Sequence, residues 1–151
     1  SILKTLDKYF NPVALRNAKN EAGAFKSRTA FAYMKPQRFL DIAKAFDTGK
    51  PDRDRAESIA QAILNKRPLD DVPYLRVIRS PIDVGGLTTF ECVGHEGRHR
   101  SAVLSQLRNP GLMPVRIVCS TTRWEEEKIE GTIRIRKQEG SLYVPVELTK
   151  V

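Results

Sequence analysis

The chain has 151 residues, of which 40% are hydrophobic and 29% are charged, a composition that is ordinary for a soluble globular protein. It contains no run near the roughly 18 apolar residues that a membrane span needs. Its two cysteines are too few for a disulfide framework or a zinc site. We therefore expect a cytoplasmic protein, or one of the host cytoplasm if it is phage-encoded, with no membrane partner.

The formal net charge of +8 is concentrated near the N-terminus. The first 38 residues hold eight Lys/Arg and two acidic residues, which leaves +6 of the total in the first quarter of the chain. Clustered positive charge favours a polyanionic partner, nucleic acid first, although a basic chain is also common for solubility alone. The predicted nucleic-acid contacts are Lys4, Lys8, Arg16, Lys19, Lys26 and Arg28.

The first 30 residues show little apolar periodicity. One helical turn is expected before Asn11-Pro12 interrupts it, and a loop or arm is expected from Asn17 to Ser27. A segment of this kind contributes little to a core. We therefore predict a basic N-terminal arm over 1–30 that lies along the surface, and a single domain over 31–151.

Two helices are predicted in the first half of this domain. Apolar residues repeat with helical spacing after Pro36, as far as Phe46, and proline suits the first position of a helix. Asp52 or Asp54 is the predicted cap of the second helix. The predicted buried face of that helix is Ala56, Ile59, Ala60, Ile63 and Leu64.

Short runs that favour β-structure accompany the helices. The predicted strands cover residues 31–34, 74–78, 87–93, 113–119, 133–135 and 143–148. A capping box of Thr122 and Glu125 predicts a further short helix ending at Gly131. The order β-α-α-β-β-α-β-α-β-β predicts an α/β (α+β) domain, with a small mixed β-sheet flanked by helices.

The stretch from 90 to 104 carries most of the chemistry. It is predicted to form a strand, a tight turn bracketed by Gly94 and Gly97, and a helix that stops near Asn109. Helical spacing places Arg100 on the inward face with the apolar residues that follow. The residues predicted to lie on the opposite, solvated face are Arg98, Ser101, Ser105 and Arg108.

An arginine on the inward side of a helix needs an anionic partner. For Arg100 that partner is either internal, such as Glu96, or a phosphate. The helix N-terminus favours a phosphate, because it offers free N–H groups and partial positive charge. In the alternative interpretation, Arg100 caps a core carboxylate while His95 and His99 are simply exposed.

The order of these motifs resembles that of the ParB/sulfiredoxin superfamily. Glu96-Gly97-Arg98-His99-Arg100 is similar to the family's acidic-Gly-His-His-Arg motif at a strand-to-helix turn. The run 113–118 is like the strand that usually follows, and 33–40 resembles the family's first box, where a strand gives way to a helix after a proline. The same pairing of motifs is similar to ParB-like domains of phage and mobile-element proteins.

The resemblance implies a pocket for the phosphates of a nucleotide or nucleic acid, with His99 beside it. The implied phosphate-binding residues are Gly97, Arg98, Arg100, Ser101, Lys35 and Arg38. Arg98 stands where sulfiredoxins have their catalytic cysteine, so their thiol-phosphate chemistry is not expected. We therefore expect a ParB-like protein that binds a phosphate-bearing ligand, most of all nucleic acid.

Two alternatives from other classes stay open. His99 and Glu96 are the candidate catalytic residues of a metal-dependent nuclease or a nucleotide-dependent phosphotransferase, for which a nucleoside triphosphate with Mg²⁺ is the candidate cofactor. We assign no metal ligands, because His95 precedes the helix start and so does not share a helix face with His99. The other alternative is a degenerate phage-type inhibitor or interaction protein with a protein partner.

Overall fold

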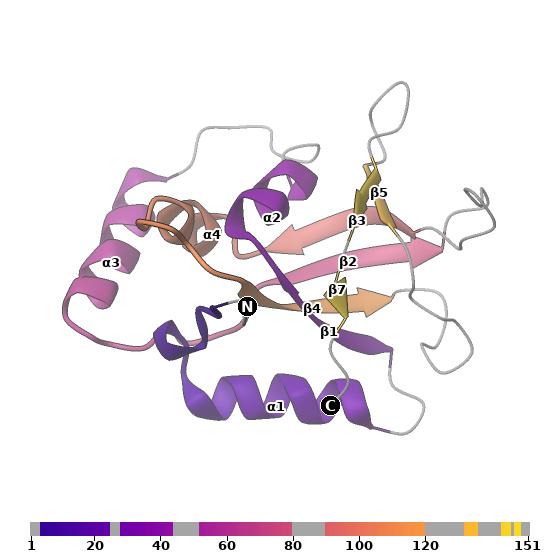
Figure 1. Ribbon diagram of the computed structural model, residues 1–151, viewed down its shortest axis with the longest axis horizontal. Helices are drawn as coiled ribbons and strands as arrows, with labels where there is room; N and C mark the ends of the chain where they lie inside the picture. Colours follow the sequence, from indigo (N-terminus) through magenta and orange to yellow (C-terminus); the bar gives the residue numbers. More distant parts are fainter. Residues whose placement is uncertain are drawn as a thin grey trace.

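The computed structural model describes residues 4–24, 28–43, 52–79 and 90–119, together with the backbone of 132–135, 143–145 and 147–148. The strands form one mixed sheet in the order β6-β5-β3-β2-β4-β1-β7 (Figure 1). Their bounds are β1 Thr29–Met34, β2 Tyr74–Arg79, β3 Phe90–Glu96, β4 Met113–Cys119, β5 Thr132–Ile135, β6 Tyr143–Pro145 and β7 Glu147–Leu148. The predicted class, a mixed sheet flanked by helices, is confirmed.

The central strands follow the sequence pattern closely. β4 occupies the predicted residues in the interior of the sheet, and all of its apolar side chains except that of Val118 are buried. It pairs in parallel with β2 and antiparallel with β1. The predicted final strand over 143–148 is divided into two short strands with different partners, since β6 pairs with β5 and β7 pairs with β1.

Strand β3 is longer at its C-terminal end than predicted. The turn expected from Gly94 to Gly97 is wrong, because Gly94, His95 and Glu96 continue the antiparallel ladder with β2. A bulge between Arg76 and Val77 shifts the register of that ladder, and strand pairing then resumes. The turn is reduced to Gly97 alone, so His95 and Glu96 are held on a strand.

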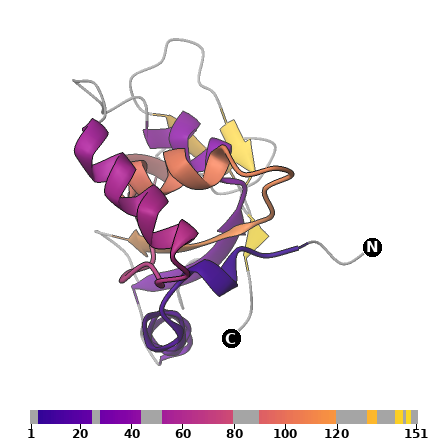
Figure 2. The same cartoon turned by 90° about the vertical axis from the view of Figure 1, so that its left-hand side faces the viewer.

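Four α-helices flank the sheet within the described residues, with bounds α1 Pro12–Gly23, α2 Pro36–Ala43, α3 Arg53–Leu64 and α4 Arg98–Ser105, and a 3-10 turn, η1, covers Asp7–Tyr9. α1 packs against β1 and β4, whereas α2 packs against α4 and β3, and α3 packs against α4. Figures 1 and 2 show α1 set apart from the other three helices. α4 ends before the predicted stop near Asn109.

The predicted helices over 36–46 and 52–64 are largely confirmed. α2 buries Phe39, Ile42 and Ala43, and Phe46 lies outside the described residues. Asp52 caps α3, since its Oδ1 accepts from the amides of Asp54 at 2.9 Å and Arg55 at 3.3 Å. The buried face expected for α3 is only partly buried, since Ala56, Ile59, Ala60 and Ile63 are of intermediate exposure and Leu64 is 73% exposed. The helix predicted over 122–131 lies outside the described residues.

The N-terminal segment differs most from the prediction. Asn11-Pro12 begins a helix instead of interrupting one, because Asn11 Oδ1 accepts from the amides of Val13 and Ala14 and Pro12 occupies the first helical position. The loop expected from Asn17 is therefore helix as far as Gly23.

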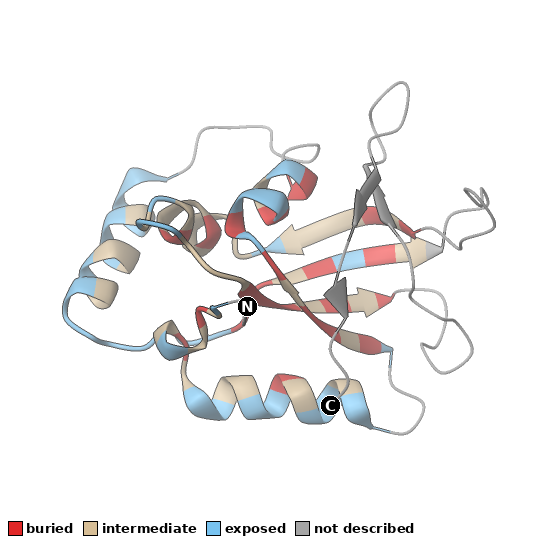
Figure 3. Ribbon diagram, viewed as in Figure 1, coloured by how far each residue is buried: buried red, intermediate tan, exposed pale blue. Residues whose placement is uncertain are grey.

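The expectation that the first 30 residues add little to the core is also wrong. Leu6 and Phe10 are each 2% exposed and belong to the main hydrophobic cluster. The backbone of Leu6 donates to Leu112 O at 2.8 Å, and Leu69 donates to Tyr9 O at 2.8 Å. Figure 3 shows buried residues in this segment as well as along the central strands.

Candidate functional site

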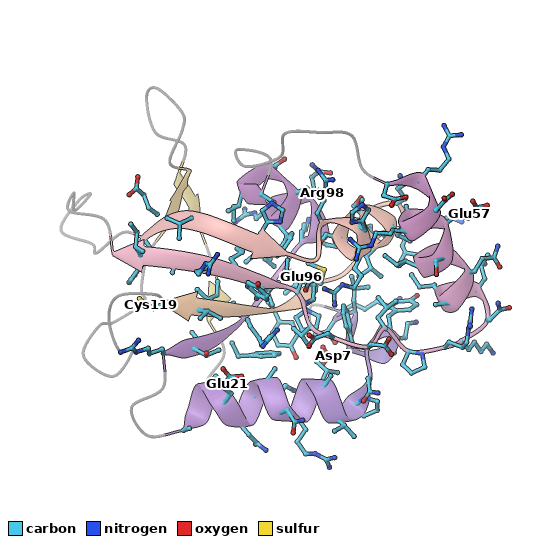
Figure 4. The ribbon with its side chains drawn as sticks, turned by 180° about the vertical axis from the view of Figure 1, so that it is seen from behind. Asp7, Glu21, Glu57, Glu96, Arg98 and Cys119 are labelled. Atoms are coloured by element: carbon cyan, nitrogen blue, oxygen red, sulfur yellow. The ribbon has the colours of Figure 1, made fainter. Side chains whose placement is uncertain are left out.

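A groove of about 760 Å³ lies between α3 and the first turn of α4, and we call it the α3–α4 groove. One wall is a stripe of α3 residues with helical spacing: Arg55, Ser58, Ile59 and Ala62. The remaining lining residues are Pro68, Leu69, Asp70, Asp71, His95, Glu96, Gly97, Arg98, His99 and Arg100. Figure 4 views this region from behind, with Glu96 at the end of β3 and Arg98 at the start of α4.

Gly97 makes the change from strand to helix possible. Its φ of 118° lies in the left-handed region, which side chains rarely allow. A Cβ at this position would lie 2.4 Å from Pro73 Cβ. Glycine is therefore required both for the backbone turn and for the close approach of the 71–73 segment to α4.

Arg100 has two partners within the protein. Its guanidinium donates to the backbone carbonyl of Asp71 and to the carboxylate of Glu96, and only 11% of its side chain is exposed. The internal partner weighed from the sequence, Glu96, is thus the one present in the structure. Arg100 fastens the end of β3 and the 71–73 segment to α4.

Arg116 of β4 holds the same segment from the other side. Its backbone amide donates to Pro73 O at 2.9 Å, and its Nη2 lies 3.4 Å from Val72 O and 3.6 Å from an Asp71 carboxylate oxygen. The segment that carries Asp71 is therefore positioned by an arginine on each side.

Ser101 does not lie where the sequence predicts. The expectation of a solvated Ser101 is wrong, because the residue is 0% exposed. Its hydroxyl donates to the Gly97 carbonyl at 2.8 Å and lies 3.6 Å from Met113 Sδ. α4 packs more deeply than its weak apolar pattern indicates, so Ser101 does not line the groove.

Both histidines are partly buried within the fold. His99 Nε2 accepts a hydrogen bond from the backbone amide of Asp52 at 2.9 Å, which joins α4 to the N-terminus of α3. The His95 ring meets the Phe39 ring edge to face, with centroids 6.4 Å apart. The interpretation that both histidines are simply exposed is therefore wrong.

The other predicted cations lie outside the groove lining. Lys35 and Arg38 are exposed at the start of α2. Lys8 Nζ lies 5.2 Å from the Tyr9 ring centre, and Lys19 Nζ lies 5.5 Å from that of Phe31. The other N-terminal cations in the described residues, Lys4, Arg16 and Arg28, are exposed, and Lys26 lies outside those residues.

The sequence reasoning missed four polar residues of the groove: Arg55, Ser58, Asp70 and Asp71. Arg55 and Ser58 share one face of α3 with Ile59, and their spacing was available in the sequence. Nothing in the sequence pairs that face with the Glu96–Arg100 motif, because the two are about forty residues apart and meet only through α3–α4 packing.

The lining is electrostatically mixed, with Arg55, Arg98 and Arg100 facing Asp70, Asp71 and Glu96. Because Glu96 is bonded to Arg100 and Asp71 lies beside Arg116, two of the carboxylates have cationic partners. Within the described part of the chain, no group of three or more His, Cys, Asp or Glu is arranged to hold a metal ion.

Comparison of the chain with protein families, curated proteins and solved structures finds no match. The fold and the groove define the class: a small α+β protein with a mixed sheet and a polar groove at a strand-to-helix turn. None of its described helices has the length and apolar character to cross a membrane.

Proposed function

We propose that this protein binds a phosphate-bearing ligand in the α3–α4 groove, at the N-terminus of α4. One observation carries the proposal: the first turn of α4 lines the groove together with three arginines, and its N-cap is a glycine with no side chain to bond the amides. A helix N-terminus provides N–H donors and partial positive charge, which suit a phosphate.

The arginines of the groove have different roles in this proposal. Arg100 is bonded to Glu96 and Asp71, so it shapes the wall and does not serve as the main ligand-binding cation. Arg98 on α4 and Arg55 on α3 supply the charge that meets the phosphate from two walls. Planar guanidinium groups suit this task because they bind phosphate through two parallel hydrogen bonds.

Nucleic acid is the ligand class that the charge distribution supports best. The N-terminal segment adds exposed cations beyond the groove, and an excess of this kind attracts a polyanion through long-range electrostatics. The resemblance to ParB-like domains points to the same ligand chemistry. A free nucleotide also suits the groove volume, which falls in the usual range of small-ligand sites, so both ligands belong in the test.

We propose that the protein binds its ligand and does not catalyse a reaction on it. A nuclease or phosphotransferase needs a group that can move a proton. Here the Glu96 carboxylate is bonded to Arg100, and His99 Nε2 accepts the Asp52 amide proton. The two candidate catalytic residues therefore have structural partners on the atoms that catalysis would use.

The test is a titration of the full chain with fluorescent single-stranded DNA, duplex DNA, ATP and CTP, each with and without Mg²⁺. Arg98→Gln should weaken binding of the true ligand at least about tenfold, as expected for loss of a charge-assisted hydrogen bond. Arg108→Gln is the matched control, because Arg108 is exposed beyond the end of α4 and outside the groove lining. Equal loss in both variants, or no binding by wild type, would overturn the proposal.

A further inference from the structure

α3 is weakly anchored compared with the other helices. None of its residues is fully buried, and its contribution to the core is limited to partly buried Ile59, Ala62 and Ile63. α4 is the element it packs against most. A helix with few buried apolar contacts opens more readily than a core helix, so individual hydrogen bonds to neighbouring elements matter more for its position. The position of the groove wall that carries Arg55 and Ser58 therefore depends on those bonds.

One such bond joins the N-terminus of α3 directly to α4. The backbone amide of Asp52 donates to His99 Nε2 at 2.9 Å. The Asp52 carboxylate is engaged in capping the amides of Asp54 and Arg55, so the backbone amide is the part of the cap that contacts α4. Imidazole accepts a hydrogen bond only when it is neutral, because both ring nitrogens of the protonated form are donors.

The surroundings of His99 contain charges of both signs. Among the described residues, α3 and its N-cap carry Asp52, Asp54 and Arg55, α2 carries Arg38 and Asp41, and α4 itself carries Arg98 and Arg100. The strand β3 adds His95 and Glu96, and the segment before β2 adds Asp70 and Asp71. The N-termini of α3 and α4 both lie here, and their dipoles oppose a cation. Protonation thus removes the Asp52 bond and places a positive charge between two helix N-termini.

We propose that His99 is a positioning residue that clamps α3 against α4 and that protonation of its imidazole releases the N-terminus of α3. In the clamped state Arg55 and Ser58 face the first turn of α4 and the groove is complete. In the released state these two residues lose their fixed distance from Arg98. Histidine is the side chain whose ordinary pKa, ~6.5, lies between pH 5 and 8, so this is the pH range in which the clamp is tested.

The clamp can be tested without any ligand, so its failure is distinguishable from failure of the proposed function. Backbone amide exchange of α3 is measured from pH 5 to 8, with correction for the intrinsic rates. In wild type, protection of α3 should fall about tenfold below pH ~6, which is the expected effect of losing one hydrogen bond. α3 protection that stays constant over this range would overturn the proposal.

Two variants assign the transition to His99. His99→Gln offers a carbonyl acceptor that does not titrate, so protection of α3 should no longer depend on pH. His95→Gln is the matched control and should keep the wild-type transition, since the chain has only two histidines. Loss of the transition in His95→Gln instead would overturn the assignment.

A measurement on the wild type covers the case in which His99→Gln does not fold. The ¹⁵N and ¹H resonances of the Asp52 amide should shift with the same midpoint as the His99 ring protons, because the two groups share the hydrogen bond. Independent midpoints would contradict the clamp.

Discussion

The protein has two basic regions, the N-terminal segment and the start of α4, and their cations differ in exposure and in bonding. In the N-terminal segment Lys4, Lys8, Arg16 and Arg28 are exposed, while Leu6, Phe10 and Ala18 are buried in the core. At the start of α4 the key cation turns inward, where Arg100 bonds Glu96 and the Asp71 carbonyl. One region presents charge to solvent on an apolar support, and the other uses charge to hold its own backbone.

The contrast shows that counting cations does not identify an anion site. Exposed lysines and arginines act through a field that salt screens within about 10 Å. A buried arginine with internal partners adds little to that field, and it positions the groups around it instead. The proposed site therefore rests on cations that line one groove, Arg98 and Arg55, together with the N-terminus of α4.

The largest expected effect tests whether the N-terminal segment belongs to the core. Phe10→Ala should lower the free energy of unfolding by about 3–5 kcal/mol, because it removes a fully buried aromatic ring. Val13→Ala, at a position that is 51% exposed in the same segment, is the control and should change stability by less than about 0.5 kcal/mol. Urea unfolding measures both free energies. A small effect in Phe10→Ala would instead support the predicted basic arm over 1–30, which lies along the surface and adds little to the core.

Gly97→Ala should have the next largest effect. The new Cβ meets Pro73 at 2.4 Å and the backbone φ is 118°, so strain and overpacking together should cost about 2–4 kcal/mol. Gly94→Ala is the matched control three residues away, where the nearest atom is the mobile Arg76 Nη2 at 3.1 Å. Thermal unfolding compares the two, and similar melting temperatures would contradict the argument.

Arg100→Ala should destabilise the fold by about 1–3 kcal/mol, since it leaves the Asp71 carbonyl and Glu96 without their partner. The effect stays moderate because the Glu96 side chain is 48% exposed and can be hydrated. A double-mutant cycle with Glu96→Gln measures the coupling between the pair. If Arg100→Ala leaves stability unchanged but abolishes DNA binding, then Arg100 is a ligand-binding residue and the contrast between the two regions is lost.

The smallest effect on stability is expected at the N-terminal surface. Replacing the exposed residues Lys4, Lys8, Arg16 and Arg28 by Gln should change stability little, because surface substitutions are usually within about 0.5 kcal/mol each. If these residues bind duplex DNA, the log–log salt slope should flatten by about 0.9 for each phosphate that is no longer neutralised. Exchanging Lys and Arg at the same four positions keeps the charge and is the control. An unchanged slope in the Gln variant would exclude the segment from the DNA interface.

Deleting the first 30 residues cannot replace that experiment. Deletion removes Leu6 and Phe10 from the core and the backbone bonds to Leu112 and Leu69. Loss of binding would then report unfolding and not the loss of positive charge. Charge substitution leaves the apolar support in place.

Local patterns in the sequence determined much of this protein. The apolar run 113–119 is long enough to predict β4 without knowledge of its neighbours. Pro36 and Asp52 mark the starts of α2 and α3 through their own backbone and side-chain chemistry. The strand-to-helix turn at Gly97 follows from the same kind of signal, since glycine alone readily adopts that conformation.

Only the tertiary structure decided which residues of different elements lie together and how deeply they are buried. Ladder pairing with β2 kept Gly94–Glu96 in a strand, and packing against Met113 buried Ser101. The α3–α4 groove exists only because packing joins two helices that are far apart in the chain, so nothing in the sequence linked Arg55 or Asp71 to the Glu96–Arg100 motif. Periodicity reports the side chains of one element, whereas a partner on another element is fixed by how the elements pack.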